Sequence, residues 1–301
     1  MRVTIVGGTG LIGTRLTAGL ASRGHTVTVV SRHERSVPGA VGHVTWDPAT
    51  GGPPAEVMNA DAIVNLAGTP VAGRWGAARK QAIRDSRVVT TARLVEAIAA
   101  AAIPPSVLVN GSAVGHYGDR RDEELTEASA PGTGFLAELC VEWESTAMLA
   151  ADSGCRVVLS RTGIVLAKEG GALAPMARAT KLGAGGPLGN GRQWWPWIHI
   201  DDVVEALAVA IEDGTTRGPI NLTAPNPARQ GDLAKALGRA LHRPAIMPAP
   251  TFALRLALGE AAEFLLNSQR ALPAALTANG YQFRHTDLAA ALDAELGGSA
   301  N

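Results

Sequence analysis

Three side chains that can hold or move a proton lie close together in the middle of the chain. Ser112, His116 and Tyr117 follow the strand-like Val107–Val109, on a loop of the kind that binds ligands in open α/β sheets. An imidazole has an unperturbed pKa of about 6.5, so His116 can serve as an acid or a base. The alternative is a loop histidine that is only solvated or hydrogen-bonded. We take all three residues as catalytic candidates.

A carboxylate base is the second candidate. The helix-like Phe135–Ala151 carries Glu138, Glu142 and Glu144. A glutamate that faces a pocket can act as a base when burial raises its pKa, whereas glutamates on an outer helix face are solvated. We take Glu138 as the catalytic candidate from this helix.

Aromatic residues gather after a glycine-rich stretch that runs from Gly183 to Gly191. Trp194, Trp195 and Trp197 come together there, directly after Arg192 and Gln193. A tryptophan can stack on a planar or sugar ring while polar neighbours anchor it. We predict substrate contacts from Arg192, Gln193 and Trp194, and Tyr117 is a further candidate; core packing or a lid explains the tryptophans as well.

A glycine motif closes the first strand-like segment and opens the first helix-like one. In Gly7-Gly-Thr-Gly10-Leu-Ile-Gly13, the first glycine permits a tight turn, the second lets the backbone approach a pyrophosphate, and the third lets helix and strand pack closely. The helix N-terminus then offers free N–H groups to phosphates. The predicted cofactor contacts from this motif are Gly7, Thr9, Gly10, Leu11, Ile12 and Gly13.

The second strand-like segment ends in Ser31-Arg32, where an NAD-preferring site usually places an acidic residue. A guanidinium there can pair with a 2′-phosphate, so NADP(H) is the predicted cofactor and Ser31 and Arg32 are predicted contacts. An ordinary solvated arginine is the alternative. Asn65-Leu-Ala-Gly68 ends another strand-like run with small residues. We add Leu66, Ala67, Gly68, Arg87 and Ser112 to the cofactor contacts.

These residues are positioned by alternating strand-like and helix-like segments. Val3–Val6, Thr26–Val30, Ala62–Leu66 and Val107–Val109 are strand-like, and Leu11–Ser22 has helical spacing with Gly24 as its stop. This alternation predicts an α/β fold, a Rossmann-type doubly wound parallel sheet. Later segments are a strand at Arg156–Leu159, a helix at Asp201–Ile211 that begins at an aspartate cap, and a strand at Pro219–Leu222. We expect a Rossmann domain over 1–243 with interleaved substrate-side segments, and a smaller C-terminal helical substrate lobe over 244–301 that ends in Thr286–Leu296.

Composition excludes several partner classes. Lysine plus arginine equal aspartate plus glutamate at 27 each, so no net charge favours nucleic acid or an anionic membrane. The two cysteines lack metal-ligand spacing, and the chain opens on a strand without a signal-like segment. We expect a cytoplasmic protein with a small-molecule substrate and no metal.

Longer motifs identify the chain as a member of a known family. It resembles the extended short-chain dehydrogenases/reductases over nearly its whole length, and within them the atypical branch of epimerase family proteins, named as nucleoside-diphosphate-sugar epimerases, with a small C-terminal domain. The motifs that carry this resemblance include Asp85-Ser-Arg87, Gly111-Ser-Ala-Val-Gly-His-Tyr-Gly118, Arg161-Thr-Gly163, and Gly189-Asn-Gly-Arg-Gln-Trp-Trp-Pro-Trp-Ile-His-Ile-Asp-Asp202. The resemblance implies a Rossmann fold, permits a homodimer, and makes His199 structural.

One part of the family's machinery is missing. The resemblance implies a serine at Ser112, a tyrosine that exchanges a proton, and a lysine four residues after the tyrosine. In the helix that should carry this pair, the two plausible registers place Phe135 and Leu139, or Leu136 and Cys140, at these positions. The family tyrosine that corresponds to Tyr117 usually lines the pocket.

Two functions therefore stay open. The chain is an NADP-dependent oxidoreductase or epimerase that acts on a small polar or sugar-like substrate through a non-standard acid–base set, or it is a nonenzymatic NADP(H)-binding sensor. We favour the enzyme because the pocket-side motifs are more specific than a nucleotide sensor requires.

Overall fold

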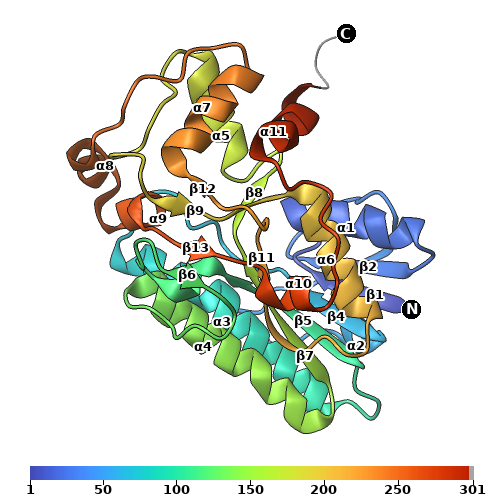
Figure 1. The fold of residues 1–301 in the computed structure, drawn as a ribbon. Helices are drawn as coiled ribbons and strands as arrows, with labels where there is room; N and C mark the ends of the chain where they lie inside the picture. The colour runs from blue at the N-terminus through green and yellow to red at the C-terminus, as the bar shows by residue number, and fades with distance from the viewer. Residues whose placement is uncertain (298–301) are drawn as a thin grey trace.

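The computed structural model describes residues 1–297 and has a seven-stranded parallel sheet at its centre (Figure 1). The strand order is β11-β7-β5-β4-β1-β2-β3. The chain winds outward from β1 in one direction and then returns to build the other half from β4, so the order reverses between β1 and β4. Ligands of open α/β sheets bind at such a reversal, beyond the carboxyl ends of the strands. The doubly wound Rossmann-type sheet predicted from the sequence is confirmed.

Apart from the edge strand β3, whose residues are partly exposed, the strands of this sheet are apolar runs largely buried on both faces, as expected for a parallel sheet covered by helices. They are β1 (Arg2–Val6), β2 (Thr26–Ser31), β3 (Ala40–Thr45), β4 (Ala62–Asn65), β5 (Val107–Ala113), β7 (Arg156–Thr162) and β11 (Gly218–Leu222). Strand β5 continues four residues beyond the predicted Val107–Val109. Ser112 therefore lies in the strand and not on the loop that follows it.

Each face of the sheet is covered by a pair of helices. α1 (Leu11–Ser22) packs against α6 (Ile200–Glu212) on one face, and α3 (Ala77–Ala100) packs against α4 (Phe135–Met148) on the other (Figure 1). The predicted aspartate cap of α6 is wrong. His199 is the N-cap, and its Nδ1 accepts a hydrogen bond from the backbone N–H of Asp201 at 3.1 Å.

The remaining elements form a smaller lobe and short connections (Figure 1). The lobe has its own apolar core, built from residues such as Leu173, Trp197, Leu237 and Leu292. The helices are α5 (Leu173–Lys181), α7 (Gln230–Ala240), α8 (Thr251–Leu258), α9 (Glu263–Leu266), α10 (Ala274–Ala278) and α11 (Leu288–Leu296), with the short α2 at Ala55–Met58; the strands are β6 (Glu124–Leu125), β8 (Ile164–Leu166), β9 (Trp194–Trp195), β10 (Trp197–His199), β12 (Ala228–Arg229) and β13 (Arg270–Ala271).

The C-terminal segment is attached to the sheet domain by backbone hydrogen bonds and by apolar packing of residues such as Leu276 and Phe283. Strand β13 pairs with β6. The buried carboxylate of Asp202 accepts hydrogen bonds from the backbone N–H groups of Arg284 at 2.8 Å and His285 at 3.0 Å. The side chain of Asn221 in β11 donates to the carbonyl of Leu272 at 2.8 Å. A boundary between residues 243 and 244 stays a prediction.

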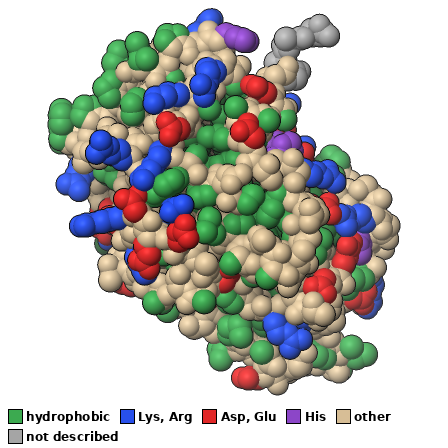
Figure 2. Space-filling view, viewed as in Figure 1, with side chains coloured by type: hydrophobic (Ala, Val, Ile, Leu, Met, Phe, Trp, Pro, Cys, Tyr) green, Lys and Arg blue, Asp and Glu red, His purple; other side chains and the backbone are tan. Residues whose placement is uncertain are grey.

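The surface carries both charge signs, interspersed with apolar residues (Figure 2). The largest exposed apolar side chains include Phe252 and Leu256 of α8 and Ile246 just before it. Within residues 1–297, none of the helices has the length and apolar character that crossing a membrane requires.

Candidate functional site

A two-part cleft opens at the point where the strand order reverses. A cavity of about 620 Å³ extends toward β2, and a second cavity of about 520 Å³ extends toward β5 and α4. Gly7, Gly10, Leu66 and Gly68 line both cavities, so the two are joined across the glycine turn. All thirteen residues predicted to contact the cofactor line one cavity or the other, namely Gly7, Thr9, Gly10, Leu11, Ile12, Gly13, Ser31, Arg32, Leu66, Ala67, Gly68, Arg87 and Ser112.

The glycine turn has the shape of a phosphate cradle. Gly7 has a φ of +79°, and a Cβ atom there would lie 2.8 Å from the backbone N of Ala67. A Cβ atom on Gly13 would lie 2.6 Å from the Cα of Gly8. Helix α1 begins beside this turn without a side-chain cap, and its first-turn N–H groups have no acceptor within the helix. A pyrophosphate fits these donors and the positive end of the helix dipole.

The cavity beside β2 suits the adenosine half of a dinucleotide. Arg32 is exposed at its edge and makes no ion pair with any carboxylate of residues 1–297. Arg35, which sequence reasoning did not select, lines the same cavity. The hydroxyl of Ser31 donates to the carbonyl of His33 at 2.7 Å and lies 2.8 Å from Nε2 of His43. Ser31 therefore shapes the turn that presents Arg32.

Arg87 places a further cation in the cleft, in addition to Arg32 and Arg35. This side chain of α3 donates to the carbonyl of Thr69 at 3.0 Å and lies over the ring of Trp143 at 5.4 Å. Burial lowers its pKa, and no carboxylate of the described chain lies within ion-pair distance. A half-buried guanidinium without a counter-ion favours an anionic or polyhydroxyl ligand at this position.

The reactive end of the cleft contains Ser112 and a carboxylate behind it. Ser112 lines the cavity and donates its hydroxyl proton to Oε1 of Glu144 at 2.5 Å. Both oxygens of Glu144 also accept from Arg161, each at 2.8 Å. Burial alone would lower the pKa of Arg161, but the paired carboxylate raises it well above its usual value. The geometry is a serine hydroxyl held by a buried ion pair.

His116 and Tyr117 lie behind this pair and not in the cavity. Tyr117 is fully buried, and its hydroxyl donates to Oδ1 of Asn221 at 2.7 Å and accepts from Arg161 at 3.0 Å. Burial raises the pKa of Tyr117, so the phenol stays protonated. The Nδ1 atom of His116 lies 3.5 Å from Glu144, and burial lowers the pKa of the imidazole. Neither residue lines the cavity, so its lining does not support the prediction of both as catalytic residues or of Tyr117 as a substrate contact.

The glutamate prediction selected the wrong position on α4. Glu138 is exposed and does not line the cleft, because it faces outward from the helix. Leu136 and Cys140 line the cavity, whereas Phe135 packs on Trp75 outside it. Leu139 lines the cavity as well, so the register with Leu136 and Cys140 in the tyrosine and lysine positions is the one in which both positions face the site. Glu144 follows Cys140 by four residues, and this helical spacing could have identified it.

The predicted substrate contacts on the tryptophan segment also lie elsewhere. Arg192 is exposed, and the buried Gln193 donates to the carbonyls of Leu188 and Leu265, each at 3.0 Å. Trp194 lies against Arg229 at 3.9 Å and donates to Asp122. None of the three lines the cleft, because the strand alternation turns Trp195 toward it instead.

The C-terminal segment supplies cavity residues that the sequence did not reveal. Glu263, Phe264, Asn267 and Gln269 line the cavity opposite α4. Sequence spacing carries no signal for them, because they reach the site through the long-range pairing of β13 with β6.

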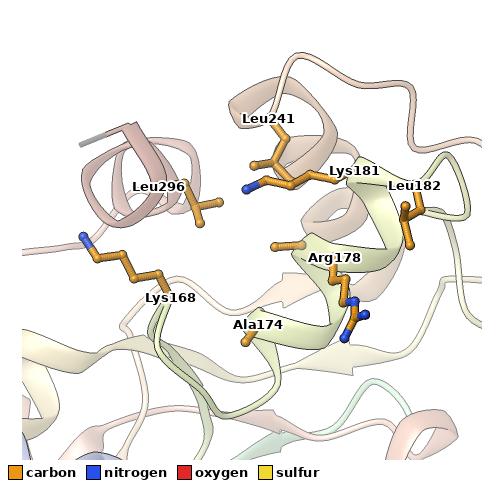
Figure 3. Close-up of a pocket in the computed structure, with 8 residues that line it drawn as sticks. Lys168, Ala174, Arg178, Lys181, Leu182, Leu241 and Leu296 are labelled. Atoms are coloured by element: carbon orange, nitrogen blue, oxygen red, sulfur yellow. The ribbon is translucent and has the colours of Figure 1, made fainter. Parts of the chain in front are cut away.

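Two other features are distinct from this cleft. Figure 3 shows a cavity between α5, α7 and α11 that contains none of the predicted site residues; Arg178 and Lys181 lie there in the last turn of α5, where cations complement the helix dipole. His199, Asp201 and His285 place possible metal-binding atoms within 4.8 Å of one another. The two imidazoles are stacked at 3.7 Å, so their nitrogen lone pairs do not converge on one point, and His199 serves as the α6 cap.

Comparisons with known proteins agree with this geometry. Residues 3–222 match the NAD dependent epimerase/dehydratase family. The chain belongs to this family. Residues 249–295 match a domain of unknown function, DUF1731. These findings confirm the resemblance that the motifs indicated, including its C-terminal domain.

Individual relatives match nearly the whole of this chain. The epimerase family protein Mb2239 of Mycobacterium bovis is 44% identical, with 96% of each chain covered. The human epimerase family protein SDR39U1 (isoform 2), crystallised with NADPH, is 38% identical with a TM-score of 0.90 and covers 100% of both chains. A nucleoside-diphosphate sugar epimerase from Corynebacterium glutamicum is 38% identical with a TM-score of 0.80; the match covers 99% of this chain and 58% of that one.

Proposed function

We propose that the chain is an NADP(H)-dependent oxidoreductase or epimerase that acts on a hydroxyl or carbonyl group through Ser112 and Glu144. The observation that carries the proposal is the 2.5 Å hydrogen bond from Ser112 to buried Glu144, at the end of a cavity that begins at the glycine turn. The cofactor assignment is supported by the open phosphate cradle, by Arg32, and by the relative crystallised with NADPH.

Different residues would bind different parts of the cofactor. The N–H groups at the start of α1 and the glycine turn would hold the pyrophosphate, and Arg32 would pair with the 2′-phosphate. Arg87 reaches from α3 toward Cys140, the position at which the wider family has its lysine. In the proposal it takes over the lysine's part in holding the nicotinamide ribose. When bound, NADP(H) supplies the hydride acceptor or donor.

Ser112 provides the proton route. Its own proton is committed to Glu144, so its oxygen presents only lone pairs to the cavity and accepts a hydrogen bond from a substrate hydroxyl. During oxidation the substrate O–H bond breaks and its proton passes to Ser112, while the proton of Ser112 passes to Glu144. With NADP⁺ bound, the hydrogen on the same substrate carbon would leave as hydride, which is the chemistry that the cofactor would supply. Reduction reverses each transfer. Arg161 is a positioning residue that fixes the carboxylate.

Cofactor binding is tested by calorimetric titration with NADPH and NADH. Arg32→Ala should lower the ratio of NADPH affinity to NADH affinity by about 10- to 100-fold, because a hydrogen bond to a charged group contributes about 1.5–3 kcal/mol. Arg93→Ala, an exposed arginine of α3 that pairs with Glu96, is the matched control and should change neither affinity. Equal binding of both nucleotides by the wild type would refute the NADP(H) assignment.

Turnover is tested with Ser112→Ala. Loss of a group in the proton route should lower kcat by about 10²- to 10⁴-fold, while NADPH affinity stays unchanged. A nonenzymatic NADP(H)-binding protein is the second candidate, because the cavity-facing positions 136 and 140 carry Leu and Cys instead of a proton-transferring pair. Tight NADPH binding without turnover on any alcohol or ketone would favour that candidate.

A further inference from the structure

The outer half of the β5-side cavity contains almost no charge. Beyond the cofactor turn it is lined by the start of α4 and by the segment Glu263–Gln269, with apolar side chains such as Leu136, Trp195 and Phe264. Arg87 and Glu263 are the charged side chains that line the cavity. The inference drawn from this lining rests on the proposed function, because it concerns the substrate of the same site.

The two charges contact different parts of the lining. Arg87 lies beside Gly68, where an added Cβ atom would approach its guanidinium within 3.0 Å. The exposed Glu263 lies beside the start of α4, where its Oε2 is 3.7 Å from the Cβ position of Gly134. A ligand that passes along the start of α4 therefore meets a carboxylate. A nucleoside diphosphate requires cations or several N–H donors at its phosphates, and a carboxylate repels it.

Nearby arginines do not add positive charge to the cavity lining. Arg229 and Arg270 lie against Trp194 at 3.9 and 5.0 Å, and they pair with Asp122 and Glu124. Neither lines the cavity. Their charges are therefore already compensated by carboxylates, outside the cavity lining.

Two amides from the C-terminal segment lie among the polar residues of the lining, which also include Thr133 just before the start of α4. The side chain of Asn267 makes no hydrogen bond within the described structure, although the residue is half-buried and lines the cavity. Gln269 donates its Nε2 to the carbonyl of Gly118 at 3.0 Å, which leaves its Oε1 as an acceptor. Together they offer a donor–acceptor amide and one fixed acceptor, the pattern that binds a hydroxyl group.

We propose that the substrate is an uncharged, mainly apolar ring compound and not a nucleoside diphosphate sugar, and that Asn267 and Gln269 bind a polar substituent at the end remote from Ser112. Leu136, Trp195 and Phe264 supply the apolar walls for the ring. Substrate selection is then a property of the C-terminal segment, and cofactor binding is a property of the N-terminal turn.

The test uses the protein saturated with NADP⁺, so that a ketone forms a complex without turnover. The probes are 1-tetralone, 6-hydroxy-1-tetralone and UDP-glucose, each followed by calorimetry and by quenching of tryptophan fluorescence. The hydroxylated ketone should bind about 5- to 10-fold more tightly than 1-tetralone, since one hydrogen bond contributes about 1 kcal/mol. UDP-glucose should show no saturable binding in the same concentration range.

The variants locate the contact. Asn267→Ala should abolish the 5- to 10-fold advantage in affinity that the hydroxylated ketone has over 1-tetralone, and it should leave NADP⁺ affinity unchanged. Asn279→Ala, an exposed asparagine at the end of α10, is the matched control and should retain the advantage. Binding of UDP-glucose at least as tight as that of the ketones, or an unchanged advantage in Asn267→Ala, would overturn the inference. Failure of the wild type to bind NADP⁺ would instead reject the proposed function on which it rests.

Discussion

Replacing Glu144 by glutamine should be among the most destabilising single changes of a polar residue in this chain. The substitution keeps the shape of the side chain but leaves Arg161 as a buried cation without a counter-ion. The two side chains are 8% and 6% exposed. Breaking a buried ion pair by removing one partner costs about 3–5 kcal/mol. At about 2–4 °C for each kcal/mol, the melting temperature should fall by about 10 °C.

The same helix provides the control. Glu142 pairs with Arg84 on the surface, where these side chains are 38% and 41% exposed, so Glu142→Gln should cost about 0–1 kcal/mol. Urea unfolding followed by tryptophan fluorescence measures both variants. The combination of Glu144→Met with Arg161→Met should recover most of the lost stability, because it removes both buried charges. If Glu144→Gln is no more destabilising than Glu142→Gln, the ion pair does not have the assigned role.

Three further predictions concern the turn, the histidine and the thiols. Gly13→Ala should abolish NADPH binding in calorimetric titration, because the added Cβ would lie 2.6 Å from the Cα of Gly8. Gly52→Ala is the control: its Cβ would meet no atom within 4 Å, and this variant should bind NADPH normally. Burial lowers the pKa of His116; the unfolded chain therefore takes up the proton first, and stability should fall as the pH decreases below about 6.5. His116→Gln should show a smaller fall between pH 7.5 and 5.5 in urea unfolding, and an identical fall would contradict this. Burial raises the pKa of Cys140 and of Cys155 to about 11, so iodoacetamide at pH 8 should label neither thiol until urea unfolds the protein.

The parts of the fold predicted from sequence are those with strong local signals. The glycine turn, helix α1 and the buried strands follow from apolar runs and glycine spacing, and the helix was predicted with the bounds Leu11–Ser22 that the structure has. Strand β3 was missed because Ala40–Thr45 lies at the sheet edge, where exposed residues and a glycine give no apolar run.

The parts of the site that escaped prediction depend on long-range contacts. Which glutamate of α4 faces inward was open to a periodicity argument, since positions 136, 140 and 144 share one helix face. No local pattern indicates that Tyr117 is covered by Asn221 and Arg161, or that Asn267 reaches the cavity. These placements follow from how the C-terminal segment packs on the sheet domain.

The backbone attachment of that segment separates stability from selectivity. The carboxylate of Asp202 accepts hydrogen bonds from the backbone N–H groups of Arg284 and His285, and β13 pairs with β6 through its main chain. Neither contact depends on which side chains the attached residues carry. Phe264 and Asn267 are therefore free to change without breaking these attachments, whereas Gln269 also donates to the carbonyl of Gly118. A single cofactor-binding scaffold can thus acquire new substrates by exchanging a few side chains in one short segment, while the residues that bind the dinucleotide stay constant.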